Sequence, residues 1–313
     1  MNNNKEMHET KIIKPRKTYN AAYYLIGLFF LFLNKINHFL RGYKTPRAFA
    51  ITEFEKAIEY DFKVVSHWLC FLREYSPAVS SIKDRVILEL GPGADLGVGI
   101  ITLMHGAKKY DSFDVNCLVK SVPDKFYEKL FSHIENIKDK EVDAGALREQ
   151  LELTRMGKNE RINYVCGKDS DLSVFKDEGI DLVFSQAALE HFEDLGNSIS
   201  LLSKIVKPGA ILVAEVDLKT HTRIIRDLDP NNIYRFSDSI YNFFRFPGSP
   251  NRLRPHEYVE ILEKNGWTDI KIIPLVILEK EYLSKVEPAY NMRFRGRASQ
   301  MDCLSMMLCA TKR

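Results

Sequence analysis

The fold of this 313-residue chain is decided by the stretch VILELGPG, residues 86–93. Its first part is an apolar run of the kind found in buried parallel strands. A glycine turn follows over residues 91–97, and the apolar segment 98–104 predicts a helix. Strand, turn and helix in this order form a cradle for a nucleotide-like cofactor, because glycines let the backbone approach a ligand closely.

Glu89 indicates which cofactor the turn holds. A carboxylate directly before the turn repels the pyrophosphate of a dinucleotide, whereas S-adenosyl-L-methionine carries an ammonium and a sulfonium and no phosphate. Here the sequence resembles the class I S-adenosylmethionine-dependent methyltransferases, whose first motif is an acidic residue, one apolar residue and then Gly-x-Gly. The resemblance implies that Glu89, Gly91 and Gly93 bind the cofactor.

A second predicted strand, residues 110–114, ends in Asp114. This acid lies about 20 residues past the glycine turn, where a doubly wound fold places the carboxylate that binds ribose hydroxyls. A carboxylate accepts two hydrogen bonds from a vicinal diol, so the residue type suits the position. We therefore assign Asp114 to the cofactor site, with an ordinary acid at a strand end as the alternative.

A third predicted strand, residues 162–166, precedes Asp169 and Ser170. The resemblance implies that an acid in this loop meets the adenine amino group, which favours Asp169 with Ser170 beside it. Asp171 is an alternative of the same kind. Gln186 follows the fourth predicted strand, and we assign it to the cofactor site as well.

The later motifs occur in the order that the family shows, so the resemblance covers roughly residues 53–313. Glu190-His191 follows the fourth strand, and Lys207-Pro208-Gly209 separates the next helix from a fifth strand. The resemblance implies an α/β, Rossmann-like sheet of seven mostly parallel strands with one antiparallel member and helices on both faces. We expect a methyltransferase domain over residues 49–313 with a helical insertion near 116–161.

Residues 1–48 form an N-terminal extension, a basic tail followed by an apolar helix. The apolar run 21–33 is shorter than the ~20 residues that span a bilayer, and no signal-peptide cleavage site follows it. Three interpretations remain open. The helix packs on protein, or lies on the inner membrane face with contact through residues 21–40, or spans the membrane. The first two place the protein in the cytoplasm.

The composition of the chain favours a cytosolic protein with a packed core. The net charge of +3 gives no reason to expect nucleic-acid binding. Hydrophobic residues make up 45% of the chain, which is ample for a packed core. The five cysteines are scattered with no CxxC pair, which favours reduced core residues of a cytosolic protein over a disulfide framework or a zinc site. No metal-ligand spacing is evident, so we expect no metal.

Two histidines, His191 and His221, follow strand ends on the predicted ligand side. Methyl transfer from a sulfonium is an in-line displacement, and an oxygen acceptor benefits from a base with a pKa near neutral, such as histidine. A structural role in its loop is the alternative for His191. For His221, which lies past the fifth strand, the alternative is an ordinary loop histidine. We name both as candidate catalytic residues.

The region 217–267 resembles methyltransferases of glycan and cell-surface polysaccharide pathways. The residues that carry this resemblance are Asp217, His221, Leu228-Asp229-Pro230, Tyr234-Arg235-Phe236-Ser237 and Asn251-Arg252-Leu253-Arg254. It makes Arg235, Asn251, Arg252 and Arg254 candidate substrate-binding residues, since guanidinium groups suit carboxylates, phosphates and sugar hydroxyls. A solvated charged surface is the alternative. We expect methyl transfer to an oxygen of a glycan or a lipid-linked saccharide.

Three other functions compete with this one. An NAD-dependent oxidoreductase would need a third glycine closer behind Gly93, and Glu89 argues against it. A non-catalytic protein with the same fold would not need Glu89, Gly91, Gly93 and Asp114 intact. A small-molecule or quinone methyltransferase at the membrane shares the chemistry and differs only in its acceptor.

Overall fold

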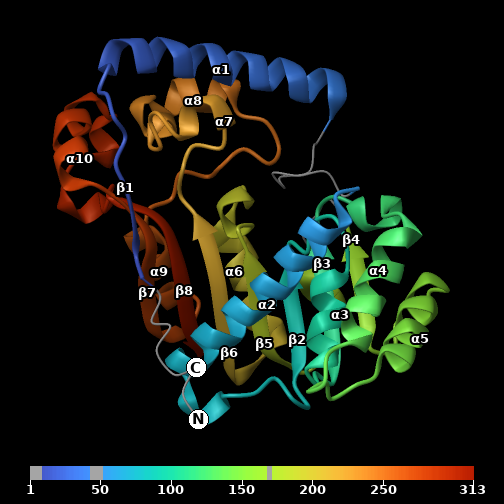
Figure 1. Ribbon diagram of the computed structural model, residues 1–313. Coiled ribbons are helices and arrows are strands. Elements are labelled where there is room, and N and C mark those ends of the chain that lie inside the picture. Colours follow the sequence, from blue (N-terminus) through green and yellow to red (C-terminus); the bar gives the residue numbers. More distant parts are fainter. Residues whose placement is uncertain (1–8, 43–51, 168–170) are drawn as a thin grey trace.

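A central eight-stranded sheet organises the computed structural model, which describes residues 9–42, 52–167 and 171–313 (Figure 1). The sheet order is β1-β7-β8-β6-β5-β2-β3-β4. β8 runs antiparallel to both of its neighbours, and the other neighbouring pairs are parallel. The strands are β1 (Lys11–Ile13), β2 (Val86–Leu90), β3 (Lys109–Asp114), β4 (Ile162–Cys166), β5 (Ile180–Gln186), β6 (Val206–Asp217), β7 (Trp267–Leu278) and β8 (Cys303–Lys312). The predicted Rossmann-like class and its antiparallel member are confirmed.

The predicted count of seven strands is wrong by one, because β1 adds an eighth. This short strand pairs in parallel with β7 at the edge of the sheet, with Lys11 opposite Val276 and Ile13 opposite Leu278. Its three residues, Lys-Ile-Ile, lie in a basic segment and carry no alternating pattern. A strand this short is held by its pairing partner, so its own sequence does not predict it.

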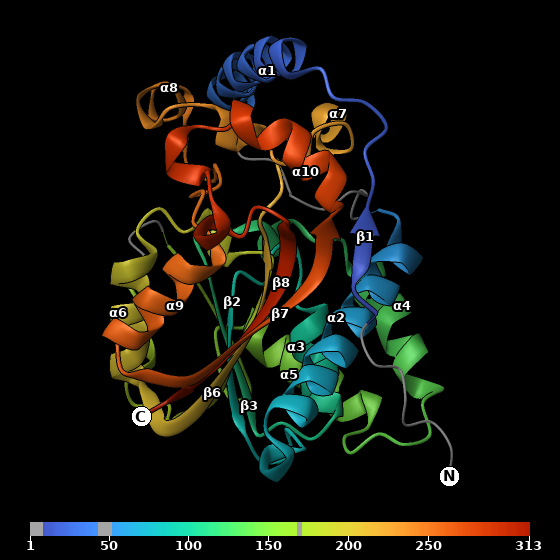
Figure 2. The ribbon, with the colours of Figure 1, turned by 90° about the vertical axis from the view of Figure 1, so that its left-hand side faces the viewer.

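Helices cover both faces of the sheet (Figure 2). The helices are α1 (Asn20–Arg41), α2 (Phe54–Tyr75), α3 (Gly97–Met104), α4 (Asp124–Glu135), α5 (Ala144–Arg155), α6 (Leu195–Ile205), α7 (Arg223–Arg226), α8 (Asp238–Phe244), α9 (Pro255–Lys264) and α10 (Lys280–Val286). One face carries α2, α3, α4 and α5, and the other carries α6 and α9 (Figure 2). The helical insertion expected near residues 116–161 consists of α4 and α5.

Successive side chains of β2 enter opposite cores, which is why the whole strand is buried. Ile87 packs into the core under α2 and α3, and Leu88 packs into the core under α6 and α9. In the first core the Trp68 indole of α2 stacks on the Phe184 ring of β5, with ring centroids 4.8 Å apart. Burial on both faces explains the near-continuous apolar run by which this strand was predicted.

A cap lies over the carboxyl edge of the sheet, formed by α1, α7, α8, α10 and the 3-10 helix η5 (Asn232–Arg235) (Figures 1 and 2). It has its own apolar core, which includes Tyr234, Phe236 and Tyr290. α7, η5 and α8 follow β6 along the chain, and α10 follows β7. These segments of the cap therefore follow the carboxyl ends of the strands, which is where α/β folds bind ligands.

Specific contacts seat α1 along the cap. The Asn20 side chain accepts a hydrogen bond from Arg235 at 3.0 Å, and the Asn34 amide donates to the Thr222 hydroxyl at 2.9 Å. Gly27 lies so close to η5 that a Cβ there would come within 1.9 Å of the Asn232 Oδ1. By length and composition alone the segment Asn20–Leu40 could cross a membrane. In the structure it is instead packed lengthwise on protein.

Candidate functional site

The glycine turn after β2 leaves an open cradle. Gly91 and Gly93 have φ of +78° and +77°, in the region that favours glycine. A Cβ on Gly91 would lie 2.4 Å from the Cβ of Ala188, so a side chain does not fit there. A Cβ on Gly93 would meet no atom within 4 Å, so this side of the turn has room for a ligand. Glu89 is buried in β2 and accepts a hydrogen bond from the Tyr110 hydroxyl.

Asp114 lies at the end of β3 and faces the turn. Its Oδ2 accepts a hydrogen bond from the Gly93 N–H at 3.1 Å, and its Oδ1 accepts from the Asn116 N–H at 2.8 Å. Each carboxylate oxygen keeps a further lone pair for a ribose hydroxyl. Burial raises the pKa of Asp114, and the backbone donors oppose that rise. The residues of the cradle therefore fit the ribose of S-adenosylmethionine.

The predicted adenine-binding pair, Asp169 and Ser170, lies outside the described residues, so their role stays a prediction. The alternative, Asp171, accepts a hydrogen bond from the Ser173 N–H at 2.9 Å and caps the 3-10 helix Leu172–Phe175. Hydrogen bonds from the side chain and the N–H of Ser173 lower the pKa of Asp171. The capping bond gives Asp171 a structural role.

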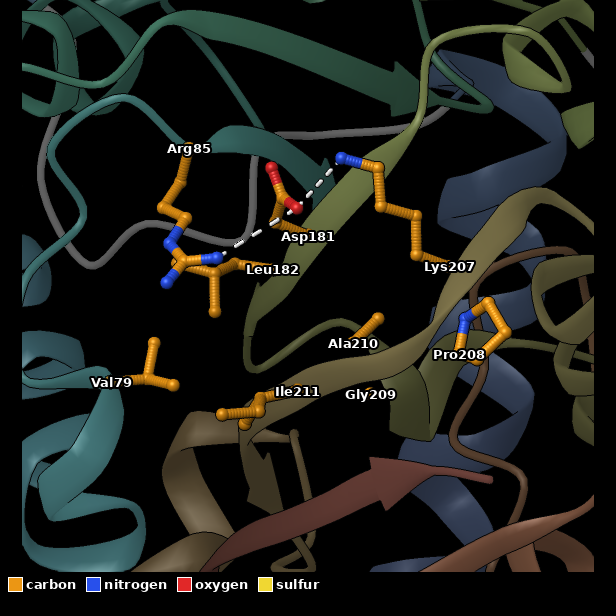
Figure 3. Close-up of a pocket in the computed structure, with 9 residues that line it drawn as sticks. All are labelled: Val79, Arg85, Asp181, Leu182, Lys207, Pro208, Gly209, Ala210 and Ile211. Carbon is orange, nitrogen blue, oxygen red and sulfur yellow. Dashed lines mark hydrogen bonds and ion pairs between the residues drawn. The ribbon is translucent and has the colours of Figure 1, made fainter.

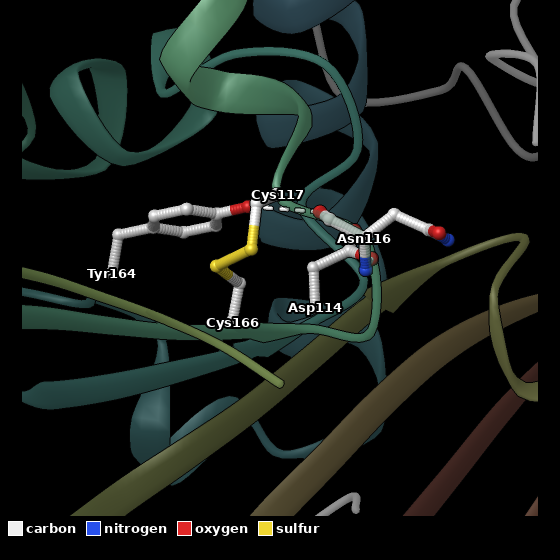
Figure 4. Close-up of a disulfide and its surroundings, with 5 residues drawn as sticks. All are labelled: Asp114, Asn116, Cys117, Tyr164 and Cys166. Carbon is white, nitrogen blue, oxygen red and sulfur yellow. Dashed lines mark hydrogen bonds between the residues drawn. A yellow bond between two sulfur atoms is a disulfide. The ribbon is translucent and has the colours of Figure 1, made fainter. Parts of the chain in front are cut away.

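A disulfide joins Cys117 to Cys166 beside the cradle (Figure 4). The expectation that all five cysteines are reduced is therefore wrong for this pair. The two residues are 49 positions apart, but β3 and β4 are parallel neighbours with Asp114 opposite Cys166. The Tyr164 hydroxyl, which donates to the Asn116 carbonyl at 3.0 Å, links the same two strand ends. The spacing of the cysteines in the sequence does not predict this disulfide, because the register of β3 and β4 brings the two residues together.

Further along the sheet, a cavity of about 340 Å³ opens at the carboxyl ends of β5 and β6. Gln186 of β5 lines it and donates to Glu215 of β6 at 2.9 Å. Glu215 also pairs with His67 of α2, with 3.4 Å between the imidazole Nδ1 and the carboxylate. His67 and Gln186 hold the pKa of Glu215 below its ordinary value, although burial opposes them. The predicted cofactor residue Gln186 thus lies at a polar cavity between β5, β6 and α2.

The two predicted catalytic histidines lie next to each other. His191 ends the 3-10 helix η4 (Leu189–His191) after β5, and His221 follows β6; their ring centroids are 4.8 Å apart. The His191 Nδ1 is 2.6 Å from the Gly248 carbonyl. Burial lowers the pKa of His221 to about 3, and His191 adds to this effect. Burial also lowers the pKa of His191. Both imidazoles are therefore neutral near pH 7.

Two carboxylates flank the histidine pair. The Nε2 of His221 is 4.0 Å from an oxygen of Glu190 and 4.0 Å from an oxygen of Asp217. Burial raises the pKa of Glu190 well above its ordinary value, and the charge of Asp217 adds to that rise. Asp217 itself pairs with Arg226. The sequence identifies Glu190 only as part of the Glu190-His191 motif, because its approach to His221 depends on the adjacency of β5 and β6.

The predicted substrate-binding arginines are buried in the protein. Arg235 pairs with Asp229 through two of its nitrogens, at 2.6 and 3.1 Å. Arg252 donates to the carbonyls of Ile233 and Phe236 at 3.1 and 2.8 Å.

Arg254 and Asn251 are also bonded internally. Arg254 is 0% exposed and donates to the carbonyls of Ser299, Gln300 and Cys303. Asn251 donates to the carbonyl of Leu189 at 3.0 Å. The donors of Arg235 and Arg252 therefore serve the cap, those of Arg254 serve carbonyls of residues 299–303, and that of Asn251 serves the η4 loop. Substrate contact through them stays a prediction, and the solvated surface that was its alternative is wrong for the arginines, because they are buried.

A cavity of about 90 Å³ lies at the opposite edge of the sheet (Figure 3). Arg85, Asp181 and Lys207 line it, and the Lys207 ammonium is 2.8 Å from Asp181. This edge carries the amino ends of β2, β5 and β6, whereas ligands of open α/β sheets bind at the carboxyl ends. We assign the Asp181 cluster to the stability of the fold.

Known proteins resemble this chain in part of its sequence and in its fold. Residues 127–214 match the methyltransferase domain family. Among curated proteins, no relative matches the sequence. One similar solved structure is the carbon methyltransferase CurJ, with 16% identity, a TM-score of 0.46, and coverage of 93% of this chain and 67% of that one.

Two further solved structures are similar. A putative S-adenosylmethionine-dependent methyltransferase from Listeria monocytogenes has 16% identity and a TM-score of 0.43, covering 77% of this chain and 97% of that one. Phosphoethanolamine N-methyltransferase 2 from Haemonchus contortus, in complex with S-adenosylmethionine, has 14% identity and a TM-score of 0.44, covering 79% of this chain and 52% of that one. These are similarities of fold alone.

Proposed function

We propose that this chain, an S-adenosylmethionine-dependent methyltransferase, transfers the methyl group to an oxygen atom of a glycan or a lipid-linked saccharide. The observation that carries the proposal is the neutral pair His191 and His221 at the carboxyl ends of β5 and β6. β5 is the strand next to β2, which bears the cofactor cradle. The histidine pair therefore lies at the end of the strand next to the one that carries the cofactor cradle.

The cradle binds and orients the cofactor, which supplies the electrophilic methyl group. The Asp114 carboxylate is held by the Gly93 and Asn116 amides, so it is already positioned to accept from a ribose diol. Gly93 leaves the space that the nucleoside needs. Fixing the donor in this way matters because alignment supplies much of the rate of an in-line displacement.

The histidines act on the acceptor. A neutral imidazole nitrogen accepts a hydrogen bond from a hydroxyl and so points an oxygen lone pair away from the proton. With a pKa of about 3, His221 is a weak base, so its main contribution is to orient the acceptor hydroxyl. His191 supports it across the 4.8 Å ring contact.

An exposed apolar surface on the cap favours an acceptor presented at a membrane. The outward side chains of α1 include Leu25, Phe29 and Phe39, which are 65%, 57% and 88% exposed. Phe243 of α8 is 68% exposed beside the same helix, and the Lys35 ammonium lies 4.9 Å above its ring. An amphipathic surface with aromatic and basic groups suits the headgroup region of an anionic leaflet. We place the enzyme in the cytoplasm, at the inner membrane face.

The contacts of α1 with η5 and Thr222 support the interfacial interpretation over a membrane span, because a spanning helix would have to leave its seat on the cap. A lipid-linked saccharide and an envelope glycan precursor share this location. A membrane quinone does as well, so the test must separate these acceptors.

Mass spectrometry of cells with and without the gene tests the acceptor. We expect the envelope glycans or lipid-linked saccharides of cells with the gene to carry one additional methyl group per modified unit. The matched control is a gene that encodes the Asp114→Asn variant. A methylated quinone with unchanged glycans would contradict the proposal.

A further inference from the structure

We propose that Glu190, His191 and His221 form a binding site for a divalent transition-metal ion. One ligand atom from each residue can be chosen so that all lie within 4.8 Å of one another. Two imidazole nitrogens and one carboxylate oxygen are a donor set that suits zinc, and also iron(II). Zinc is the ion that we infer.

His191 is oriented as a metal ligand would be. Its Nδ1 lies 2.6 Å from the Gly248 carbonyl, so Nδ1 carries the proton and donates it. The lone pair of the ring is therefore on Nε2. Metal-binding histidines usually donate their other ring N–H to a carbonyl or a carboxylate, which fixes both tautomer and orientation.

His221 and Glu190 bring buried atoms that lack partners. The Nδ1 of His221 and both carboxyl oxygens of Glu190 have no hydrogen-bond partner in the part of the chain that the structure describes. Glu190 is 2% exposed. The 4.0 Å between His221 Nε2 and Glu190 is too long for a hydrogen bond. Burying polar groups without partners is costly, and a cation bound by one ring nitrogen of His221 and one oxygen of Glu190 would satisfy part of this deficit.

The distances require only a small closure of the site. Ligand atoms bound to zinc at about 2.0 Å in a tetrahedron are about 3.3 Å apart. The Nδ1 of His221 has no hydrogen-bond partner among the described residues, and its Nε2 is already 4.0 Å from a Glu190 oxygen. Asp217 lies 4.0 Å from the same Nε2 atom of His221 and pairs with Arg226, so it flanks the site beside Glu190.

Three protein ligands leave a fourth position open, as in catalytic rather than structural zinc sites. We expect this position to face the oxygen of the methyl acceptor, and that expectation rests on the proposed function. The inference of metal binding does not depend on the proposed function. In the metal-bound enzyme the imidazoles would hold the ion, and the ion would take over the orientation of the acceptor oxygen.

The test is metal binding by the full chain without any acceptor. Protein stripped with a chelator is titrated with Zn²⁺ in a calorimeter, and with Co²⁺ while visible absorption is recorded. We expect one ion per chain and the absorption of cobalt in a site of low coordination number. Glu190→Gln and His221→Asn should each weaken Zn²⁺ binding by about 100-fold or more. His133→Asn, on the distant helix α4, is the matched control and should bind as the unaltered chain does.

Circular dichroism and S-adenosylmethionine affinity establish that each variant is folded. No Zn²⁺ binding by the unaltered chain, or equal binding by Glu190→Gln, would overturn the inference. An enzyme that methylates a glycan without binding metal overturns this inference alone. An enzyme that binds zinc at Glu190 but methylates no glycan overturns the proposed function alone.

Discussion

The Asp114 carboxylate accepts a hydrogen bond from the Gly93 amide across 3.1 Å, and this bond ties the end of β3 to the glycine turn after β2. Two adjacent parallel strands thus share one polar link at the mouth of the cradle. The carboxylate is fixed before the cofactor arrives, which reduces the ordering that binding requires. The first prediction concerns this link.

Cofactor affinity should depend on the ionised form of Asp114. Burial raises the pKa of this carboxyl, and protonation removes acceptor capacity that the ribose hydroxyls need. Affinity for S-adenosylmethionine should therefore fall as the pH falls through the Asp114 pKa, and at a higher pH than an ordinary aspartate would give. Calorimetric titrations across acidic to neutral pH measure this.

The control for that prediction is Asp114→Asn, which keeps the shape of the side chain but does not ionise. We expect it to bind about 100-fold more weakly at neutral pH, about 2.7 kcal/mol, with the acid-dependent step removed. Asp177→Asn, an exposed acid away from the cradle, should leave affinity unchanged. Wild-type affinity in Asp114→Asn would show that the ribose does not lie there.

Substitution of Arg254 should lower the stability of the fold rather than act directly on acceptor binding. Its guanidinium satisfies the carbonyls of Ser299, Gln300 and Cys303 in a fully buried position. Arg254→Met would leave these groups without their donor, and we expect a loss of about 3 kcal/mol or more in the free energy of unfolding. Arg297→Met, an exposed change nearby, is the control in denaturant titrations. Unchanged stability with a raised acceptor KM would restore the substrate-binding role.

The apolar face of α1 should bind anionic membranes. Phe29→Asp combined with Phe39→Asp removes two exposed aromatic rings and adds negative charge, so vesicle binding should fall at least about tenfold. Sedimentation with vesicles of phosphatidylglycerol and phosphatidylcholine measures the effect. Met156→Asp, at a residue 70% exposed on the far side of the fold, is the matched control. Equal binding by the double variant and the unaltered chain would contradict an interfacial α1.

The Cys117–Cys166 bond should be detectable by alkylation. Of five cysteines, three are free in the structure, so mass spectrometry of denatured protein should find three alkylated thiols without reductant and five with it. Cys117→Ser should lower the free energy of unfolding under oxidising conditions by about 2–4 kcal/mol. Cys70→Ser, which changes a free cysteine, should not show this redox dependence. Five reactive thiols in protein purified without reductant would contradict the pairing.

The cradle could be predicted from sequence because its determinants are local. The apolar run of β2, the glycine turn and the helix α3 are consecutive, and each has a simple physical signature. The position of Asp114 follows from the length of one strand-helix-strand unit. The predicted strands 110–114 and 162–166 agree closely with β3 and β4. The Lys207-Pro208-Gly209 turn that was expected to precede the fifth strand is instead part of β6, which begins at Val206.

Other features depend on which segments meet in space, and no local pattern carries that information. The pairing of Cys117 with Cys166 arises from the register of β3 and β4. Arginine is usually found at the surface, yet Arg252 is buried under the cap, where its guanidinium donates hydrogen bonds to backbone carbonyls. His221 approaches Glu190 only because β5 and β6 are neighbours.

A crystal structure of the chain with S-adenosylhomocysteine tests the central claim most directly. The account predicts the ribose diol on the Asp114 carboxylate and the nucleoside over Gly93, with the homocysteine sulfur directed toward the ends of β5 and β6. A complex in which the nucleoside lies elsewhere, or in which the cradle holds a phosphate-bearing coenzyme, would contradict it.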